Sequence, residues 1–257
     1  MAIETLIAWT DHTFNPWMGC TKVSDGCKNC YAATMTKNRM GLALWGDSAP
    51  RQVTKSPWQH VRQWERSAAA GGPGILGNGS HLVFTGSLMD WAENRPDLIE
   101  PRTRLWDVVR ESPHLTFQML TKRPENIRRF LPSDWGEGYP NVWLGTSVED
   151  MRVAWRADQL RDIPAVVRFI SYEPALGSLN DLDLAGLDWV IYGGESGTGY
   201  RQEDKEWARE MNRKCQEAEV AFFHKQSSAF RTEIGIELDG HIVRNFPTAR
   251  VPQQSAS

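Results

Sequence analysis

Three cysteines close together are the first residues of this chain that could do chemistry. Cys20, Cys27 and Cys30 follow a C-x6-C-x2-C spacing, and the fourth cysteine, Cys215, lies far downstream. No histidine stands in this loop to complete a set of four ligands. Clustered thiols in a long chain that is otherwise poor in cysteine are typical of metal ligands rather than of disulfides. The spacing therefore indicates a metal or a cluster with three protein ligands and one open position.

Three interpretations of this cysteine loop are open. A structural zinc ion normally takes four ligands, so a distant residue such as His12 or Cys215 would have to be the fourth. Unliganded core thiols normally sit among apolar residues, whereas these stand among Thr, Lys, Ser, Asp, Gly and Asn. A [4Fe–4S] cluster usually takes four thiolates, so three would leave one iron free to bind a small molecule. We favour the iron–sulfur interpretation, because it accounts for the missing ligand.

The composition indicates an ordinary globular protein. Of 257 residues, 40% are hydrophobic and 24% are charged, and the formal net charge is −3. A weakly acidic chain has no overall positive field, so strong non-specific binding of nucleic acid is not indicated. The first residues do not resemble a signal peptide, and no apolar run is long enough to span a membrane. We expect a cytoplasmic protein that does not contact a membrane.

Short apolar runs alternate with helical patterns from residue 82 onwards. The runs predicted as strands are residues 82–85, 115–120, 142–145, 166–170, 189–192 and 220–223. Helical patterns cover 97–111, 124–131, 149–161 and 203–218, and a further helix is expected to begin at the third cysteine. This alternation predicts an α/β fold with a parallel sheet covered by helices. With the extended segment 12–19, about seven strands fit a full or partial (β/α) barrel, and a doubly wound open sheet is the alternative.

We expect one α/β domain over residues 1–257. Residues 41–81 are rich in Gly, Pro, Ser and Trp and are predicted to be an irregular insertion. Asp239-Gly240 between apolar neighbours predicts a small β-hairpin within the C-terminal segment 232–257, followed by a frayed tail.

Polar residues follow each predicted strand, at the end where parallel α/β folds place their active sites. Serines there, Ser147 among them, are suited to capping the next helix. Capping does not explain Lys122, Glu173, Glu195 and Lys225, so these are the stronger site candidates. The Gly193-Gly194 pair allows close backbone approach and could expose N–H groups to an anionic part of a ligand.

Six motifs occur in order over residues 7–226. They are Asn-Pro-Trp-x-Gly-Cys-Thr-Lys-Val-Ser-x-Gly-Cys-x-x-Cys-Tyr-Ala, Leu-Thr-Lys-Arg-Pro-Glu, Asn-Val-Trp-Leu-Gly-Thr-Ser-Val-Glu, Ser-Tyr-Glu-Pro, Trp-Val-Ile-Tyr-Gly-Gly-Glu-Ser-Gly and Phe-His-Lys-Gln. Together they resemble the three-cysteine-motif family of phage and bacterial proteins of unknown function. That family in turn resembles radical S-adenosylmethionine (AdoMet) enzymes of the spore photoproduct lyase type, which repair DNA. The first gap between cysteines is wider here than the C-x3-C-x2-C of those enzymes.

The resemblance implies a partial TIM-type barrel, a [4Fe–4S] cluster on Cys20, Cys27 and Cys30, and AdoMet on the open iron. Tyr31 would then lie near the adenine, and Glu173 or Glu195 would accept hydrogen bonds from the ammonium or ribose of AdoMet. Lys122 or Lys225 would pair with its carboxylate or with a substrate phosphate. Ser147, Gly193 and Gly194 complete the expected cofactor site.

An enzyme of this kind needs an electron donor such as a flavodoxin or ferredoxin, and it would repair DNA or modify bases. Trp17, Trp45 and Trp91 are predicted near the barrel mouth, where they could stack on bases. Two other functions stay open. One is a non-catalytic or redox iron–sulfur protein that does not use AdoMet, and the other is a zinc-stabilised binding module.

Overall fold

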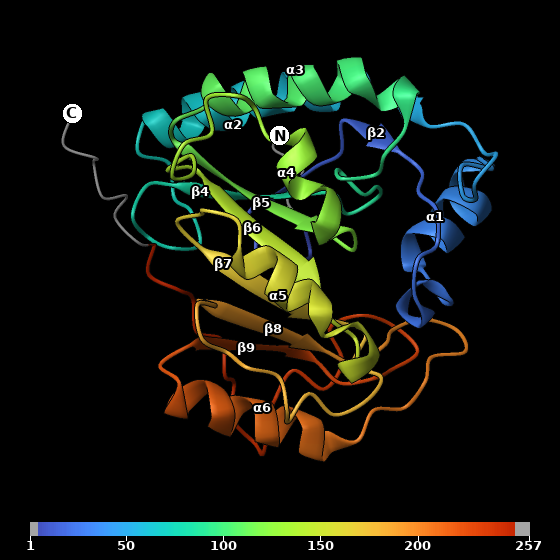
Figure 1. The fold of residues 1–257 in the computed structure, drawn as a ribbon, viewed down its shortest axis with the longest axis vertical. Coiled ribbons are helices and arrows are strands. Elements are labelled where there is room, and N and C mark those ends of the chain that lie inside the picture. The colour runs from blue at the N-terminus through green and yellow to red at the C-terminus, as the bar shows by residue number, and fades with distance from the viewer. Residues whose placement is uncertain (1–4, 250–257) are drawn as a thin grey trace.

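Seven parallel strands form the central sheet of the protein (Figure 1). The computed structural model describes residues 5–249. The sheet order is β1-β4-β5-β6-β7-β8-β9, with every neighbouring pair parallel. The strands are β1 (His12–Phe14), β4 (His81–Thr85), β5 (Leu115–Thr121), β6 (Val142–Ser147), β7 (Arg168–Tyr172), β8 (Trp189–Gly193) and β9 (Ala221–Gln226). The sheet curls into a half barrel, so the prediction of a partial barrel of six or seven parallel strands is confirmed.

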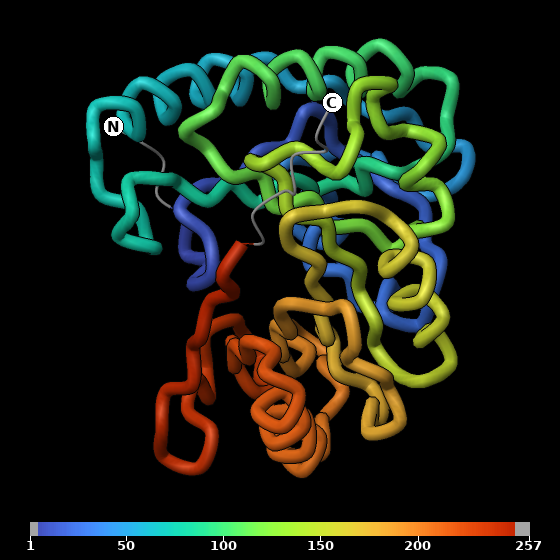
Figure 2. Tube along the Cα trace, turned by 60° about the vertical axis from the view of Figure 1, so that its left-hand side comes forward, coloured from blue at the N-terminus to red at the C-terminus, as the bar shows by residue number. Residues whose placement is uncertain are grey.

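Helices and short 3₁₀ turns connect most of the strands, and most of the helices cover the outer face of the sheet. They are α1 (Tyr31–Met40), α2 (Pro57–Ala69), α3 (Ile99–Arg110), α4 (Ile127–Phe130), α5 (Trp155–Arg161) and α6 (Lys205–Glu217), with 3₁₀ turns η1 (Asp25–Cys27), η2 (Pro96–Leu98), η3 (Pro124–Asn126) and η4 (Met151–Val153). In Figure 1, α2 and α3 lie together at the top, α6 lies at the bottom, and α1 stands beyond the ends to which the strands point. Figure 2 shows the curl of the chain from its blue edge to its red edge.

Successive side chains of a strand point to opposite sides of the sheet, and here both sides are covered by a hydrophobic core. Phe222 packs in the larger core beneath the helices, whereas its neighbour Phe223 packs in a second core with Trp9, Phe84 and Trp189. Trp9 meets the Phe84 ring at a centroid distance of 4.5 Å and Trp189 edge-on at 6.1 Å. These rings fill the concave side, so the half barrel has a solid interior away from the carboxyl ends of its strands.

The prediction that residues 41–81 are irregular is wrong for residues 57–69. Residues 57–69 form α2, which begins with a proline in its first turn and buries Trp58, Val61, Trp64 and Ala68. This spacing places all four on one helical face, which explains why a Gly-rich and Ser-rich region still contains a core helix. Upstream of it, β3 (Gln52–Val53) pairs antiparallel with β2 (Trp17–Met18) in a separate two-stranded sheet.

The expected C-terminal hairpin is reduced to its turn. Asp239 and Gly240 have positive φ angles of 52° and 80°, and backbone hydrogen bonds join Leu238 and His241 in both directions. Beyond the turn, the chain pairs with the edge of β9 instead, where Phe223 and Arg244 form an antiparallel bridge. Covering an exposed strand edge satisfies its backbone groups, which favours this pairing over a free hairpin. The predicted tail at residues 250–257 lies outside the described residues.

In residues 5–249, no helix has both the length and the apolar character needed to cross a membrane.

Candidate functional site

The cysteine loop lies across the carboxyl ends of the strands and closes one side of a cavity of about 420 Å³. Backbone contacts with two other segments fix the start of this loop. The N–H of Gly19 donates to the carbonyl of Leu88 at 3.0 Å, and Cys20 forms a β-bridge with Trp45. The cavity is lined by most of the residues that the sequence singled out, namely Cys20, Cys27, Cys30, Tyr31, Lys122, Ser147, Glu173, Glu195 and Lys225. Residues from six separate segments of the chain therefore meet at one site.

The three thiols are free and face this shared space. Cys27 is buried, whereas Cys20 and Cys30 are partly exposed. Burial raises the pKa of the Cys20 thiol to about 12 and also raises that of Cys30. Among residues 5–249, no group of three or more His, Cys, Asp or Glu side chains is arranged to hold a metal ion.

Glu149 ties the middle of the cysteine loop to the barrel. Its fully buried carboxylate accepts hydrogen bonds from Ser24 Oγ at 3.0 Å, Lys122 Nζ at 2.5 Å and Arg156 Nη1 at 2.9 Å. Gly26 lies directly against it, since a Cβ at that position would stand 2.4 Å from Glu149 Oε1. Only glycine leaves room for this approach, so the glycine before Cys27 sets how closely the loop sits on the barrel.

Arg51 anchors the first part of the loop from the other side. Its side chain is fully buried and makes a two-pronged ion pair with Glu93, with both N–O distances at 2.7 Å. A third contact, from Nη2 to Thr21 Oγ1 at 2.7 Å, reaches the residue after Cys20. Arginine suits this position because its planar fork can satisfy a carboxylate and several carbonyls at once. The region predicted to be irregular thus supplies a support of the cysteine loop.

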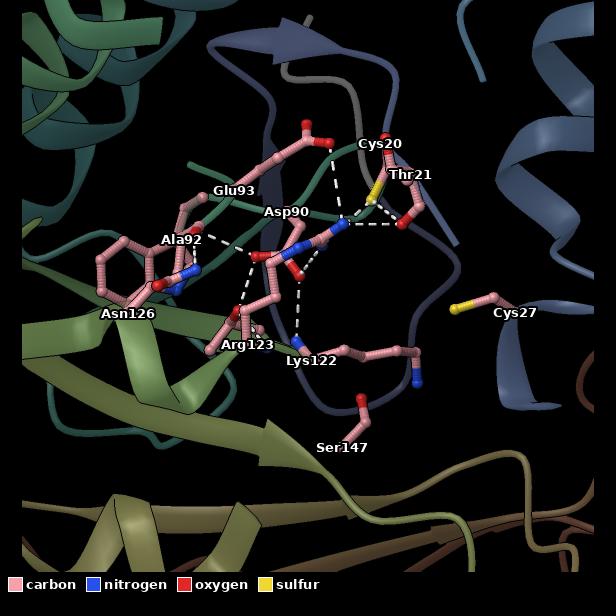
Figure 3. Close-up of polar contacts among 12 residues, drawn as sticks. Cys20, Thr21, Cys27, Asp90, Ala92, Glu93, Lys122, Arg123, Asn126 and Ser147 are labelled. Atoms are coloured by element: carbon pink, nitrogen blue, oxygen red, sulfur yellow. Dashed lines mark hydrogen bonds and ion pairs between the residues drawn. The ribbon is translucent and has the colours of Figure 1, made fainter. Parts of the chain in front are cut away.

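Arg123 stands behind Cys20 in the same buried network, as Figure 3 shows. It donates from Nη1 to Asp90 at 2.8 Å and to Cys20 Sγ at 3.5 Å, and from Nη2 to the carbonyl of Thr21 at 2.8 Å. Asp90 in turn accepts from Thr121 Oγ1 at 2.6 Å, at the end of β5. A guanidinium group beside a thiol favours its thiolate form, which is the form that binds iron.

Glu195 is used by the protein itself. One carboxylate oxygen accepts from Asn29 Nδ2 at 3.0 Å and the other from Arg201 Nη2 at 2.5 Å. Burial acts to raise the pKa of Glu195, but the hydrogen bonds from Arg201 and Asn29 outweigh it and hold that pKa below its ordinary value. The residue before Cys30 is thereby fixed to the segment after β8, which is a structural use of both Glu195 and Asn29.

Two lysines on the cavity wall carry a carboxylate partner each. Lys225 Nζ lies 2.5 Å from Glu173 Oε1, and both side chains are mostly buried. Lys122 is bound to Glu149 in the same way. Tyr31 projects at the rim and donates its hydroxyl to the carbonyl of Ser87 at 2.7 Å. The cavity that the thiols line is therefore also lined by the ion pair of Lys225 and Glu173 and by Lys122, whose partner is Glu149.

Gly193 and Gly194 differ from their expected use, and Ser147 agrees with its expected use only in part. The two glycines are not among the residues that line the cavity. A Cβ on Gly194 would stand 2.1 Å from the N atom of Ser228, and one on Gly193 would meet Glu173 at 2.8 Å, so both glycines allow close packing. Ser147 lines the cavity but caps no helix, because Asp150 caps η4 by accepting from the N–H of Arg152.

Sequence reasoning missed Arg51, Glu93 and Arg201 as residues that position the loop. No local pattern distinguishes them, and only their long-range partners show what they do. Of the tryptophans expected at the mouth, Trp17 and Trp91 are fully buried, which corrects that prediction, and Trp45 lines the cavity.

A family model described as "Protein of unknown function (DUF5131)" matches residues 4–247 of the chain. No curated protein and no solved structure shows a significant match to it.

Proposed function

The chain belongs to the DUF5131 family of proteins of unknown function. From its three cysteines and from the resemblance of its motifs to radical AdoMet enzymes, we propose that it is a [4Fe–4S] protein of that type that acts on nucleic acid. The single observation that carries this proposal is the arrangement of the three free thiols. They line a cavity at the carboxyl ends of parallel strands, together with Lys122 and the ion pair of Lys225 and Glu173. In this proposal Cys20, Cys27 and Cys30 hold the cluster, and its fourth position faces the cavity.

The paired charges suit an amino acid group. Glu173 can accept from an ammonium while its partner Lys225 turns to a carboxylate, so a zwitterion can replace an existing ion pair without leaving either charge unpaired. Lys122 offers a second cation for a carboxylate or a phosphate. The cavity of about 420 Å³ falls within the usual range for small-molecule sites.

When bound and reduced, the cluster would supply the electron that cleaves a C–S bond of AdoMet, and the protein would orient the fragments and exclude water. Glu149, Arg51 and Arg123 would keep the cysteine loop in place during that step. Because free thiols persist in a reducing compartment, we assign the protein to the cytoplasm, with a flavodoxin or ferredoxin as the electron donor.

A nucleic-acid substrate, in DNA repair or base modification, is supported mainly by the family resemblance. On the protein itself, Phe230 is 67% exposed, and the guanidinium of Arg231 lies 5.5 Å from its ring at the cavity mouth. An exposed ring beside an arginine is the combination that stacks on an unpaired base and contacts its phosphate.

The test of this proposal is AdoMet cleavage. The protein is purified without oxygen, reduced with dithionite and incubated with AdoMet, and 5′-deoxyadenosine is measured. The proposal predicts its formation by the wild type, its loss in Cys30→Ala, and its retention in Cys215→Ala, a buried cysteine on α6 away from the cavity. A protein that holds iron and sulfide but forms no 5′-deoxyadenosine would be a redox iron–sulfur protein instead. Binding of zinc without iron would leave the zinc-stabilised module.

A further inference from the structure

A second cavity lies on the outside of the barrel, between α3 and the segment 129–133. Its volume is about 510 Å³, and none of its lining residues lines the cysteine cavity. One wall is a single face of α3 that contributes Ile99, Arg102 and Trp106 at helical spacing. The opposite wall contributes Arg129 and Phe130.

Arg102 is unusual among the buried charges of this protein. It is 4% exposed, yet its guanidinium donates only to the backbone carbonyls of Trp91 at 2.9 Å and Glu93 at 2.6 Å. The two carboxylates near enough to favour its charge, those of Asp90 and Glu93, are already bound by Arg123 and Arg51. Carbonyls satisfy hydrogen bonds but do not neutralise a cation, and buried cations in proteins are normally paired.

Burial disfavours the charged form of the Arg102 guanidinium. Burial is the main cause that lowers the pKa of Arg102 to about 10, and the nearby Arg129 acts in the same direction. Both guanidinium groups approach the Phe130 ring, Arg102 at 3.8 Å and Arg129 at 5.6 Å from its centroid. Arg129 forms no ion pair among the described residues. Arg129 is exposed, so an anion that contacts both guanidinium groups would neutralise the buried charge of Arg102 from the solvent side. Charge-assisted contacts to a phosphate suit the arginine fork.

The remaining lining is mixed: Asn94, Arg95, Thr103, Asp107, Arg110 and Ser133 are polar or charged, and Asp107 is paired with Arg110. The apolar part includes Ile99, Trp106 and Phe130. Ile99 is 63% exposed on α3, and Trp106 and Phe130 stand deeper in the cavity wall. An exposed aliphatic side chain next to aromatic rings offers a surface for a flat ring, at a short distance from the two cations. The cavity therefore combines a place for an anion with a place for a ring.

We propose that this cavity binds a small phosphate-bearing ligand with a flat ring, of the nucleoside monophosphate class, through Arg102 and Arg129. The phosphate lies between the two guanidinium groups, and the ring lies against Ile99 and Trp106. This site is separate from the cysteine cavity and does not depend on a cluster. Arg102 also holds the carbonyl of Glu93, whose carboxylate supports the cysteine loop through Arg51, so the two cavities share one supporting residue.

The test is isothermal titration calorimetry, in which the full-length protein is titrated separately with adenosine 5′-monophosphate, adenosine and inorganic phosphate. We expect the monophosphate to bind, and adenosine to bind at least about tenfold more weakly because it lacks the anion. Arg129→Ala should weaken the monophosphate about tenfold. Arg128→Ala is the matched control, since it removes the same charge from the same helix at a residue that does not line the cavity.

Two further measurements separate this site from the cysteine cavity. Binding should persist in Cys30→Ala and in the presence of excess S-adenosylhomocysteine, whether or not the proposed function holds. Arg102→Lys should weaken binding of the monophosphate without changing the number of sites per chain. Thermal unfolding of this variant beside the wild type checks that it is folded. The proposal is overturned if the monophosphate does not bind, if Arg128→Ala weakens it as much as Arg129→Ala, or if S-adenosylhomocysteine displaces it.

Discussion

Replacing Glu93 with glutamine removes the carboxylate that neutralises buried guanidinium groups behind the cysteine loop. Glu93 accepts two hydrogen bonds of 2.7 Å from Arg51, and Arg123 lies 3.7 Å from the same carboxylate. The side chains of Arg51 and Glu93 are 0% and 5% exposed, so water cannot take the place of the lost charge. The substitution keeps the shape of residue 93 and leaves a buried cation without its partner.

Glu93→Gln should lower the free energy of unfolding by a large amount, although it replaces only one carboxylate oxygen with an amide nitrogen. Breaking a buried ion pair by removing one partner costs about 3–5 kcal/mol, because the other charge stays desolvated. Arg123 keeps its partner Asp90, so the cost falls mainly on Arg51. Replacing both residues, Arg51→Met with Glu93→Met, removes the unpaired charge and should recover part of the loss.

Urea unfolding followed by tryptophan fluorescence measures this effect in the protein without iron. Glu100→Gln is the matched control, because Glu100 is exposed on α3 and should change the free energy of unfolding by less than about 0.5 kcal/mol. A loss below about 1 kcal/mol for Glu93→Gln would refute the reasoning. Equal stability of the double replacement and Glu93→Gln would show that the unpaired cation is not the cause.

Three other predictions address the pH response, the fit of the loop and the cluster. Burial and the neighbouring His81 lower the pKa of His12 to about 4, so between pH 6.5 and 4 this histidine takes up its proton only in the unfolded chain. The free energy of unfolding should therefore fall by about 2 kcal/mol as the pH is lowered over that range. In urea unfolding, His12→Phe should lack this part of the loss. Gly26→Ala places a Cβ 2.4 Å from Glu149, so it should lower the melting temperature and the iron retained after reconstitution, and unchanged values would contradict the close fit. Arg123→Lys keeps the charge but loses the guanidinium group that donates to Cys20 Sγ. In a redox titration, the reduction potential of the reconstituted cluster should drop by about 60 mV, which is equivalent to about 1.4 kcal/mol for one electron. An unshifted potential would argue against this contact.

The sheet could be predicted because most of its strands are apolar runs, and β4, β5, β6 and β8 are each followed by a helical pattern. That regularity also predicted where the site lies, since the carboxyl ends of parallel strands meet at one edge. It explains why Lys122, Glu173 and Lys225, which are far apart in the chain, line the same cavity as the cysteines. The helix α2 was missed because Gly and Ser around it suggested a loop, although Trp58 and Trp64 have helical spacing.

The supports of the site could not be predicted, because they depend on pairs that no local pattern links. Arg51 and Glu93 are 42 positions apart, and Glu149 contacts Ser24 across 125 positions. Whether a charged side chain is exposed or buried follows from tertiary packing rather than from its neighbours in sequence. Glu195 shows the same limit: its position at a strand end suggested cofactor binding, and its contacts with Asn29 and Arg201 give it a structural use.

The central claim is that three thiols at the mouth of this half barrel hold an iron–sulfur cluster. The most direct measurement is the iron and acid-labile sulfide per chain in protein purified without oxygen. We expect about four of each in the wild type and in Cys215→Ala, and a large loss of both in Cys20→Ala, Cys27→Ala and Cys30→Ala. Stoichiometric zinc without sulfide, or iron and sulfide that persist in the three cysteine variants, would contradict this claim.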